Sequence, residues 1–437
     1  MRIAIIGSGI SGLGAAWLLR QNHAVTVFEA SDYLGGHTHT VDVELDGITA
    51  PVDTGFLVFN DRTYPNLLGL FAELNVPWTS SDMSLSVRLP MHNLEWCGSS
   101  LGTLFAQKRN LLRPAFWNML RDILRFNREA KAWLSKHEAD ITLGDFLVRG
   151  AYGHWFRNAY LLPMAAAIWS CPMARMEKYP ARSILQFYHN HGLLQIFDRP
   201  QWRTVVGGGR EYVQKIVKQL PDVRLNTPVQ ELYPAHTGGV YLRYGDKEEH
   251  FDQVICAVHG DQAKKLLGVH WPKQSAALAH CHYEDNHAYL HWDDHFLPKR
   301  RKAWAAWNFH ADGLIDGKRA VAVTYLINQL QPLPFKQPVM VTLNPQVSPD
   351  PQKTWADFHY AHPIFDHAAI AAQQHIQKLQ GEGGLWFCGA WLRHGFHEDG
   401  LRSAVEVANA LGIKASWQKN PTAIGTPWRE TCPQLAR

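Results

Sequence analysis

Three glycines near the start of the chain have the spacing of a loop that binds a dinucleotide. Gly7, Gly9 and Gly12 follow a short apolar stretch at 2–6 and precede an apolar helical pattern at 13–21. Gly7 would permit a tight turn, Gly9 would let the backbone approach a pyrophosphate, and Gly12 would let helix and strand pack closely. The N-terminus of the predicted helix adds free N–H groups and the positive end of its dipole. The pattern therefore predicts a diphosphate site.

A carboxylate follows at the position where such a site holds a ribose. The second apolar strand is expected at 24–28 and runs directly into Glu29. This side chain can accept hydrogen bonds from both ribose hydroxyls, and it would repel a 2′-phosphate. A glycine motif becomes specific when strand, loop, helix and acid occur in this order. Residues 1–29 therefore predict a Rossmann-type unit that binds a dinucleotide.

Further glycine motifs indicate which dinucleotide is bound. Gly-Gly-His-Thr at 35–38 and Asp-Thr-Gly-Phe at 53–56 follow the acid, and a predicted strand at 385–391 with the glycine-rich stretch at 395–401 comes near the other end. These segments resemble the FAD-binding motifs of the amine oxidase and phytoene desaturase superfamily. A nicotinamide enzyme has no use for a second cofactor motif so far downstream. The resemblance therefore implies non-covalent FAD.

The resemblance also assigns individual contacts, with two departures from the family pattern. His37 stands where most relatives carry arginine, so a phosphate contact there would be weaker and could depend on pH. Ala390 replaces an acid that contacts the ribityl chain, a contact that Asp399 or the backbone would then make. The segment 226–229 resembles the strand that meets the adenine. The implied FAD-binding residues are Gly7, Gly9, Ser11, Gly12, Glu29, Ala30, Gly36, His37, Thr38, Thr54, Gly55, Phe56, Val229, Gly389, Asp399, Gly400 and Leu401.

The cofactor motifs lie far apart in the sequence, so the domain that holds FAD must be discontinuous. We expect an α/β protein in which a Rossmann-type FAD-binding domain carries an α+β substrate domain, as in amine-oxidase-like proteins. Near the C-terminus a buried strand is expected at 385–391 and a helix at 402–411. The expected ranges are 1–80, 200–275 and 380–412 for the FAD-binding domain, 81–199 (largely helical) and 276–379 (half-buried antiparallel sheet) for the substrate domain, and 413–437 for a C-terminal extension.

The candidates for catalysis and substrate binding are fewer. His397 is the candidate catalytic residue because it lies inside the motif that meets the flavin, and helix capping is the alternative role. Trp169, Trp307 and Phe396 are candidates for an apolar substrate pocket, with core packing as the alternative. Five histidines crowd 280–295, but they lie on predicted strands with mixed facing and without carboxylate or cysteine partners at characteristic spacing. We therefore expect no metal site.

Composition indicates a globular protein with an ample core. The chain has 437 residues, of which 46% are hydrophobic and 19% charged. It begins directly with the first strand, which leaves no room for a signal peptide, and it has no apolar run of membrane-spanning length. Its six cysteines form no CxxC pair. We expect reduced thiols and a cytoplasmic protein.

The positive charge is concentrated in one segment. Between Lys108 and Lys136 there are eight basic and two acidic side chains, a surplus of +6, whereas the whole chain carries +4. Apolar side chains alternate with them at roughly helical spacing. One interpretation is an amphipathic helix with a solvated basic face. The other is a surface that docks on anionic phospholipid at the inner face of the membrane. No nucleic-acid partner is expected, because no reader motif accompanies the charge.

The chain as a whole is similar to a bacterial branch of the superfamily described as predicted NAD/FAD-binding proteins. The likeness is carried by 52–66, 162–170 and 387–401. This branch is similar to flavoproteins associated with cyclopropane-synthase-like methyltransferases that modify fatty acyl chains. The resemblance implies an FAD-dependent oxidoreductase that desaturates a phospholipid acyl chain by hydride transfer to flavin N5, with a methyltransferase as partner. The open alternatives are a soluble amine oxidase, a non-redox flavin isomerase or mutase, and a flavin-stabilised partner of the methyltransferase.

Overall fold

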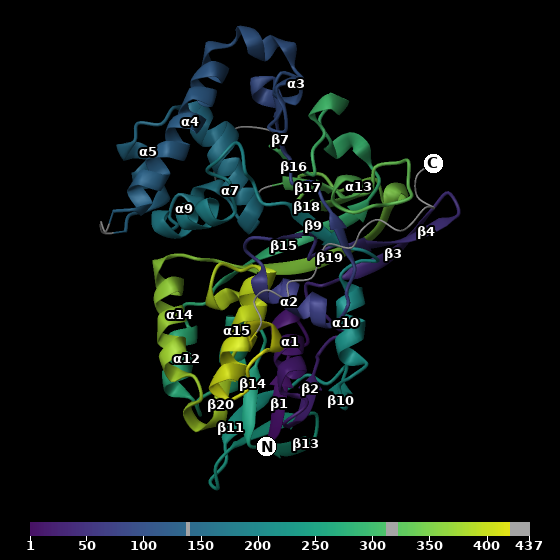
Figure 1. The fold of residues 1–437 in the computed structure, drawn as a ribbon, viewed down its shortest axis with the longest axis vertical. Coiled ribbons are helices and arrows are strands. Elements are labelled where there is room, and N and C mark those ends of the chain that lie inside the picture. The colour runs from purple at the N-terminus through teal and green to yellow at the C-terminus, as the bar shows by residue number, and fades with distance from the viewer. Residues whose placement is uncertain (137–139, 312–321, 420–437) are drawn as a thin grey trace.

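A five-stranded parallel sheet forms the base of the molecule (Figure 1), in the order β10-β2-β1-β14-β20. The computed structural model describes residues 1–136, 140–311 and 322–419. Parallel neighbours need crossover connections, so strands distant in the sequence lie side by side. The members are β1 (Arg2–Ile6), β2 (Ala24–Phe28), β10 (Asp222–Arg224), β14 (Gln253–Cys256) and β20 (Leu385–Phe387). They come from the three segments predicted for the FAD-binding domain, whose boundaries stay a prediction.

Both faces of this sheet are covered, as the buried apolar residues of its central strands β1, β2 and β14 require. Ile3 and Ile5 face the helices α1 (Ile10–Leu19) and α15 (His397–Ala410). Ala4 and Ile6 face the other way. That second face is covered by the antiparallel sheet β11 (Glu231–Pro234), β12 (Val240–Tyr244), β13 (Lys247–Phe251), and by α11 (Gly260–Leu267), α12 (Pro272–Leu278) and α14 (His367–Leu379).

A seven-stranded mixed sheet crosses the middle of the molecule above the base (Figure 1), in the order β19-β15-β18-β17-β16-β7-β8. Its strands are antiparallel except for the pair β16 and β7. Its members are β7 (Leu85–Leu89), β8 (Leu94–Cys97), β15 (Tyr283–His291), β16 (Trp307–His310), β17 (Ala322–Leu326), β18 (Met340–Leu343) and β19 (Thr354–Pro363). The expected sheet at 276–379 is therefore present, extended by two strands from the segment before 199.

Helices cover the upper face of this sheet and share one large core with it. The longest is α4 (Pro114–Leu134), which buries Phe116, Met119 and Phe126 at helical spacing and exposes its other side. The others are α3 (Leu101–Leu104), α5 (Leu143–Arg149), α6 (His154–Phe156), α7 (Leu162–Trp169), α8 (Met173–Met176) and α9 (Ala181–Asn190), with a π turn at Arg157–Leu161.

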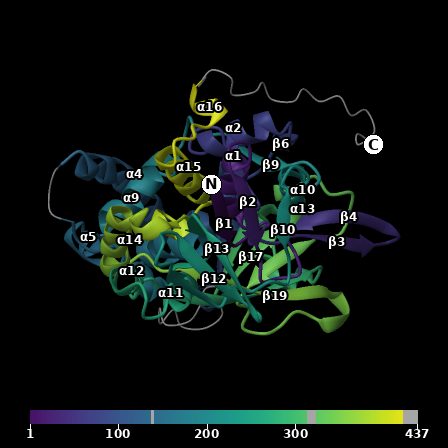
Figure 2. The ribbon, with the colours of Figure 1, turned by 90° about the horizontal axis from the view of Figure 1, so that it is seen from below.

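Smaller elements join the two parts. The hairpin of β3 (Thr40–Leu45) and β4 (Ile48–Asp53) extends on the side opposite α12 and α14 (Figure 2). The remaining elements are β5 (Phe59–Asn60), β6 (Trp78–Ser80), β9 (Trp202–Val205), α2 (Pro65–Glu73), α10 (Arg210–Val217), α13 (Ile327–Leu330), α16 (Ser416–Lys419) and short 3-10 turns at Pro90–His92, Lys108–Leu112, Asp294–Phe296, Arg301–Ala303, Pro351–Lys353, Glu382–Gly384 and Ala390–Leu392. Among the described residues, no helix is both long and apolar enough to cross a bilayer.

Four local expectations were wrong, three of them in the bounds of an element and one in its secondary structure. The first helix begins at Ile10 rather than 13, and the last strand ends at Phe387 rather than 391. The last helix begins at His397 rather than 402, because the Asp399 carboxylate accepts the backbone N–H of Phe396 and fixes its first turn. The segment 226–229 is not a strand. Asn226 has a φ of 49° and Pro228 has no N–H to donate, so a regular ladder cannot continue there.

Candidate cofactor and substrate site

The three glycines after β1 occupy the positions that their predicted roles require. Gly7 has a φ of 100°, and a Cβ there would lie 2.7 Å from the Ala257 carbonyl oxygen. A Cβ at Gly12 would overlap the Gly7 carbonyl oxygen, so helix and loop touch there. A Cβ at Gly9 would meet nothing within 4 Å. The backbone at Gly9 is therefore open to a ligand, as a diphosphate loop requires.

The N-terminus of α1 supplies donors for an anion. Its N-cap is Gly9, which has no side chain to accept from the first-turn N–H groups, and that turn carries no acid. Close packing brings α15 to the same place: a Cβ at Gly400 would lie 2.8 Å from Ser11 Oγ, and one at Gly14 would lie 2.5 Å from Leu401 Cδ1. The predicted residues of the first and last motifs therefore meet at this helix end.

Glu29 lies beside the loop, at the end of β2. Its Oε2 accepts from the Ser8 backbone N–H at 2.8 Å and from Ser8 Oγ at 2.6 Å, and its Oε1 accepts from the N–H of Ser31 at 2.9 Å. The N–H of Thr227 donates to the Glu29 carbonyl at 2.8 Å, which places the stretch leading to Val229 beside Ala30 and the carboxylate. Although that stretch is not a strand, it lies beside Glu29, and its contact with an adenine stays a prediction.

A cluster of imidazoles surrounds His37. Its ring centroid lies 5.7 Å from that of His259, 5.6 Å from that of His362 and 5.3 Å from that of Tyr360. Burial lowers the pKa of His37 and of His259 to about 4, and the pKa of His362 to about 3. These rings are uncharged at neutral pH. His37 can therefore donate one hydrogen bond to a phosphate but cannot supply the charge of the arginine that it replaces.

Sequence reasoning missed His259, His362 and Tyr360. The first follows β14 and the other two belong to β19, so only the packing of both sheets brings them to His37. His259 lies just after the carboxyl end of β14, where ligand sites of parallel sheets gather. The three imidazoles keep accessible surface although desolvation lowers each pKa, as expected for side chains that line an internal space.

The second motif is tied to the first by backbone and side-chain contacts. The N–H of Phe56 donates to the His37 carbonyl at 2.8 Å, and a Cβ at Gly55 would overlap that same carbonyl. The hydroxyls of Thr54 and Tyr360 lie 2.7 Å apart. Residues 35–38 and 53–56 therefore form one wall, and a Cβ at Gly36 would lie 3.2 Å from the Gly9 Cα.

His397 is held against this wall. Its ring stacks on Phe56 with centroids 3.8 Å apart and planes at 12°. Its Nε2 lies 2.9 Å from the hydroxyl of Tyr212 and 3.3 Å from that of Thr38. Burial lowers its pKa to about 3. A ring so fixed and so weakly basic is suited to orienting a neighbour and is a poor proton acceptor at neutral pH.

The acids of the last motif have structural partners. Asp399 Oδ2 accepts the Phe396 N–H at 3.0 Å, and Glu398 accepts from the backbone N–H groups of Asn66 and Leu67 at the start of α2. Burial raises the pKa of Glu398 to about 7. The Gly389 N–H donates to Ser403 Oγ at 2.9 Å. A contact from Asp399 to a ribityl chain stays a prediction, because one of its oxygens already caps α15.

These features fit FAD. The open backbone at Gly9 and the uncapped end of α1 suit the diphosphate, and the Glu29 carboxylate suits a ribose. The neutral rings of His37 and His397 line an interior that can accept a flavin without burying uncompensated charge.

An aromatic wall stands next to the last motif. Phe396 stacks on Phe187 of α9 with centroids 4.6 Å apart, and Trp169 lies 4.8 Å from Phe187 and 6.1 Å from Phe396. His191 continues the stack at 3.8 Å from Phe187, and its pKa is lowered to about 4 by burial. Trp169 and Phe396, which were singled out from the sequence, therefore form one apolar surface with Phe187 of α9 and with His191, which follows α9; neither of these two was predicted.

Trp307 belongs to a neighbouring contact. Its ring meets Tyr325 edge-on at 4.8 Å, and the side chain of Tyr325 hydrogen-bonds with that of Ser170, next to Trp169. The indole N–H of Trp307 is buried and has no hydrogen-bond partner. A buried donor without a partner costs free energy, and a ligand oxygen would satisfy it. Direct contact of Trp307 with the aromatic wall stays a prediction.

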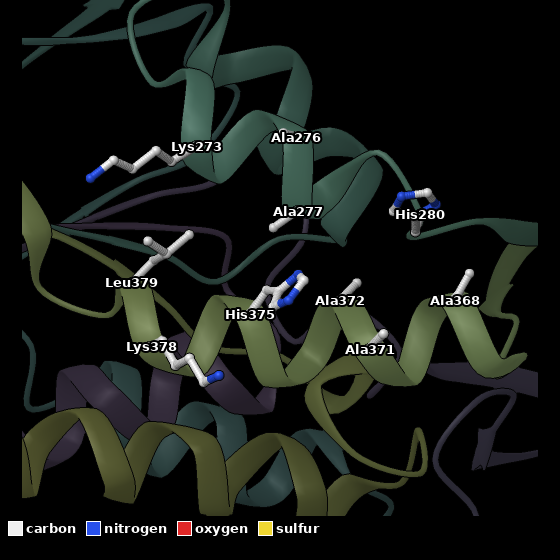
Figure 3. Close-up of a pocket in the computed structure, with 10 residues that line it drawn as sticks. All are labelled: Lys273, Ala276, Ala277, His280, Ala368, Ala371, Ala372, His375, Lys378 and Leu379. Atoms are coloured by element: carbon white, nitrogen blue, oxygen red, sulfur yellow. The ribbon is translucent and has the colours of Figure 1, made fainter.

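An open hollow between α12 and α14 is separate from this site (Figure 3). Ala277 of α12 and Ala372 of α14 face each other across it, and its lining residues include Lys273, His280 and Lys378. None of the candidate cofactor or substrate residues lines it. The imidazole cluster and the aromatic wall, not this hollow, are therefore the candidate active site.

Comparison with known proteins agrees with this geometry. The family model for "Flavin containing amine oxidoreductase" matches residues 10–412, which include α1 and the later motifs up to α15. The chain is similar to the carotenoid phi-ring synthase of Streptomyces griseus, with 27% identity over 290 residues that make up 61% of this chain and 53% of that protein. It thus spans about half the length of this curated relative.

Two solved structures share the fold. The fatty acid isomerase of P. acnes that produces CLA has a TM-score of 0.68 at 12% identity, covering 94% of this chain and 99% of that one. The cyclohexylamine oxidase of Brevibacterium oxydans has a TM-score of 0.65 at 15% identity, with the same coverage of 94% and 99%. These likenesses concern the arrangement of the elements alone.

Proposed function

Because the chain belongs to the family of flavin-containing amine oxidoreductases, we propose that it is an FAD-dependent oxidoreductase whose substrate is a lipid acyl chain. The observation that carries the choice of substrate is the apolar wall of Trp169, Phe187 and Phe396 beside the last cofactor motif. The reaction would be a desaturation or a related oxidation at an allylic or methylene carbon. When bound, FAD supplies the acceptor for hydride.

The side chains of the site have distinct tasks in this proposal. Gly9 and the N-terminus of α1 bind the diphosphate, and Glu29 binds the ribose. The aromatic wall holds a methylene chain and excludes water by burial of apolar surface. The unpartnered indole N–H of Trp307 would donate to an oxygen of the substrate. These groups bind and orient, which is a large part of what a hydride transfer needs.

His397 acts as an orienting residue in this account. Its Nε2 is within hydrogen-bond distance of Tyr212, and its ring face rests on Phe56. With a pKa lowered to about 3, it remains neutral and a weak base at neutral pH. We therefore assign it the positioning of cofactor or substrate, and we leave the proton to another group or to water.

The relatives support a lipid-like substrate without fixing it. The curated relative is named for a carotenoid ring synthesis, and one solved structure is named as a fatty acid isomerase. Both substrates are long and apolar, as the aromatic wall requires. The methyltransferase partner inferred from the sequence stays a prediction, and co-purification of the two proteins would test it.

A second surface supports access to lipid. Leu112 and Leu101 are 86% and 77% exposed, and Leu111, Trp117 and Leu124 are exposed near them in the same segment. Exposed basic side chains are interleaved with this apolar set: Lys108, Arg109, Arg121, Arg128 and Lys131. A large exposed apolar patch with cationic neighbours is typical of a surface that binds an anionic membrane. We propose that the enzyme takes its substrate at such a membrane as a peripheral protein.

Arg125 does not belong to this surface. Its Nη1 donates to the Gly150 carbonyl at 2.7 Å, its Nη2 lies 3.3 Å from Asp122 Oδ1, and its guanidinium stacks over Tyr152. It therefore fixes α4 to the neighbouring loop. Of the basic residues between Lys108 and Lys136, those that face outward carry the docking proposal.

Lipid analysis of a strain that lacks the protein tests the choice of substrate. The proposal expects loss of a modified acyl species and retention of its unsaturated precursor. Restoring the gene should restore the product, whereas a copy with Gly9→Ala should not. An unchanged lipid profile would contradict the proposal.

Amine oxidation is the second candidate. The family is named for it, and the cyclohexylamine oxidase shares the fold. Reduction of the flavin by simple amines, together with an unchanged lipid profile in the deletion strain, would favour it. The isomerase or mutase alternative predicts instead that product forms without consumption of an electron acceptor.

A further inference from the structure

Two histidines and a carboxylate meet on the seven-stranded sheet, away from the cofactor. His287 of β15 is paired directly with His359 of β19, and Asp357 stands two residues before His359, on the same face. His287 Nε2 lies 2.7 Å from Asp357 Oδ2, and the two imidazoles stack with centroids 4.4 Å apart. One ligand atom from each of the three residues lies within 4.8 Å of the others.

This trio occupies the face of β19 that is turned from the candidate active site. Side chains alternate along a strand, and Tyr360 and His362 are the ones that reach His37. Asp357 and His359 therefore point to the other side, where both are exposed. A ligand bound there could not touch the cofactor directly.

The orientation of His287 is fixed by a neighbour. The hydroxyl of Tyr289 lies 3.0 Å from His287 Nδ1 and 3.2 Å from Ser348 Oγ. Without a metal ion, Nε2–H of His287 donates to the Asp357 carboxylate. When Nε2 binds a metal ion instead, Nδ1 carries the proton and can donate it to the Tyr289 hydroxyl. Histidines that bind metal ions are commonly held by such a contact to the second ring nitrogen.

We propose that His287, Asp357 and His359 bind a zinc ion that links β15 to β19. Two imidazoles and one carboxylate suit zinc, whereas magnesium and calcium prefer sites made of oxygen alone. Water would complete the tetrahedron. The sequence predicted no metal site because the histidines at 280–295 lack a nearby carboxylate, but the antiparallel pairing supplies Asp357 from β19.

The ion would have a structural effect. Cross-linking β15 and β19 stabilises the folded state by mass action, because the unfolded chain does not bring the three ligands together. The strand β19 also carries Tyr360 and His362 on its other face. Bound zinc would therefore hold the strand that supports the imidazole cluster.

Calorimetric titration with zinc chloride, on cofactor-loaded protein first stripped with a chelator, tests the proposal. We expect saturable binding of one ion by the wild type and at least tenfold weaker binding by His287→Gln and His359→Gln. Tyr289→Phe should weaken binding about tenfold through the loss of orientation. His236→Gln removes an exposed histidine from the turn between β11 and β12 and should bind as the wild type does.

Two further measurements keep the test decisive. Zinc should raise the thermal unfolding midpoint of the wild type and of His236→Gln but not of His359→Gln. Because Asp357 is exposed, Asp357→Asn is a variant expected to fold normally, and it should also weaken zinc binding. Equal zinc binding by wild type, His359→Gln and Asp357→Asn would overturn the proposal. It would also be overturned if His236→Gln weakened zinc binding as much as His359→Gln does.

Discussion

Phe56 and His397 stack face to face, with ring centroids 3.8 Å apart and planes at 12°. One belongs to the motif after β4 and the other opens the last helix, so this contact closes the site between the two ends of the chain. Tyr212 holds the histidine from α10 at 2.9 Å. The three segments predicted for cofactor binding therefore meet at a single point.

The glycines of the first loop should respond differently to the same substitution. Gly9→Ala adds a methyl group where nothing lies within 4 Å, so the unfolding midpoint of the FAD-free protein should be unchanged while the variant retains less FAD. Gly12→Ala would overlap the Gly7 carbonyl and should destabilise the fold itself. Thermal unfolding and FAD fluorescence of the two variants separate these outcomes. Full FAD retention by Gly9→Ala would contradict the assignment of the diphosphate.

Removing the carboxylate at the end of β2 should weaken cofactor binding. Glu29→Ala loses charge-assisted hydrogen bonds to the ribose and should cost about 1–3 kcal/mol of FAD binding. Glu29→Gln keeps the size of the side chain, and its FAD affinity should fall between that of Glu29→Ala and that of the wild type. Equilibrium dialysis measures the affinity, and Glu73→Gln in α2, away from the loop, serves as control. Equal affinity of all four proteins would exclude the ribose contact.

His397→Ala should keep FAD but slow its reduction by substrate. Since burial holds the pKa of His397 near 3, the structure predicts an orienting role. His397→Asn should then recover part of the rate, because it restores a hydrogen-bond partner for Tyr212. Stopped-flow reduction of the flavin measures the rate. If the rate of flavin reduction depends on pH in the wild type and this dependence disappears in His397→Asn, His397 would instead have a proton-transfer role.

Membrane binding should depend on both the apolar and the basic parts of the exposed segment. Replacing Leu112 and Trp117 by Glu, or reversing Arg121 and Arg128 to Glu, should abolish binding to anionic vesicles. Added salt should weaken binding of the wild type, since exposed charges are screened over about 8 Å at physiological ionic strength.

The control for this surface lies elsewhere on the molecule. Reversing both Lys264 and Lys265, which are exposed on α11, makes the same change in net charge and should leave vesicle binding intact. Sedimentation with neutral and anionic vesicles measures the difference. Equal binding to both kinds of vesicle would show that the basic side chains are only solvated.

Stability should fall as the pH is lowered from about 6.5 to 4. Buried imidazoles have a folded pKa below the unfolded value, so over this range the unfolded chain binds protons that the folded one does not. Buried carboxyls act in the opposite direction, because burial raises the folded pKa of Asp399 and raises that of two others to about 6 and about 7. The imidazoles are His37, His259, His362 and His397, and the two other carboxyls are Asp53 and Glu398.

The imidazoles outnumber the carboxyls, so we expect a lower unfolding midpoint at pH 5 than at pH 7. His362→Asn should reduce this difference. Thermal unfolding across the pH range measures it, and an unchanged or higher midpoint at pH 5 would contradict the neutral state of the cluster.

Local patterns were enough to predict the cofactor unit. The spacing of Gly7, Gly9 and Gly12 and the position of Glu29 after a second strand predicted the dinucleotide site, although the close contact at Gly7 also involves Ala257 from a distant segment. The family likeness added the later motifs. The helical and sheet character of the two insertions also followed from periodicity. The family membership inferred from these motifs is confirmed by the match over residues 10–412.

Contacts between distant segments could not be predicted. His259 and His362 reach His37 only because β14 and β19 belong to sheets that pack together. Likewise, Asp357 meets His287 through strand register, and no sequence spacing announces it. The bounds of α15 were missed because its cap is made by Asp399 from inside the predicted loop.

Anaerobic mixing of FAD-loaded protein with phospholipid vesicles tests the central claim most directly. The visible absorbance band of oxidised flavin should disappear when the vesicles carry unsaturated acyl chains, and it should persist with saturated chains or with simple amines. The lipid recovered afterwards should have lost hydrogen from its acyl chain. Loss of the band with amines but not with any lipid would contradict the claim.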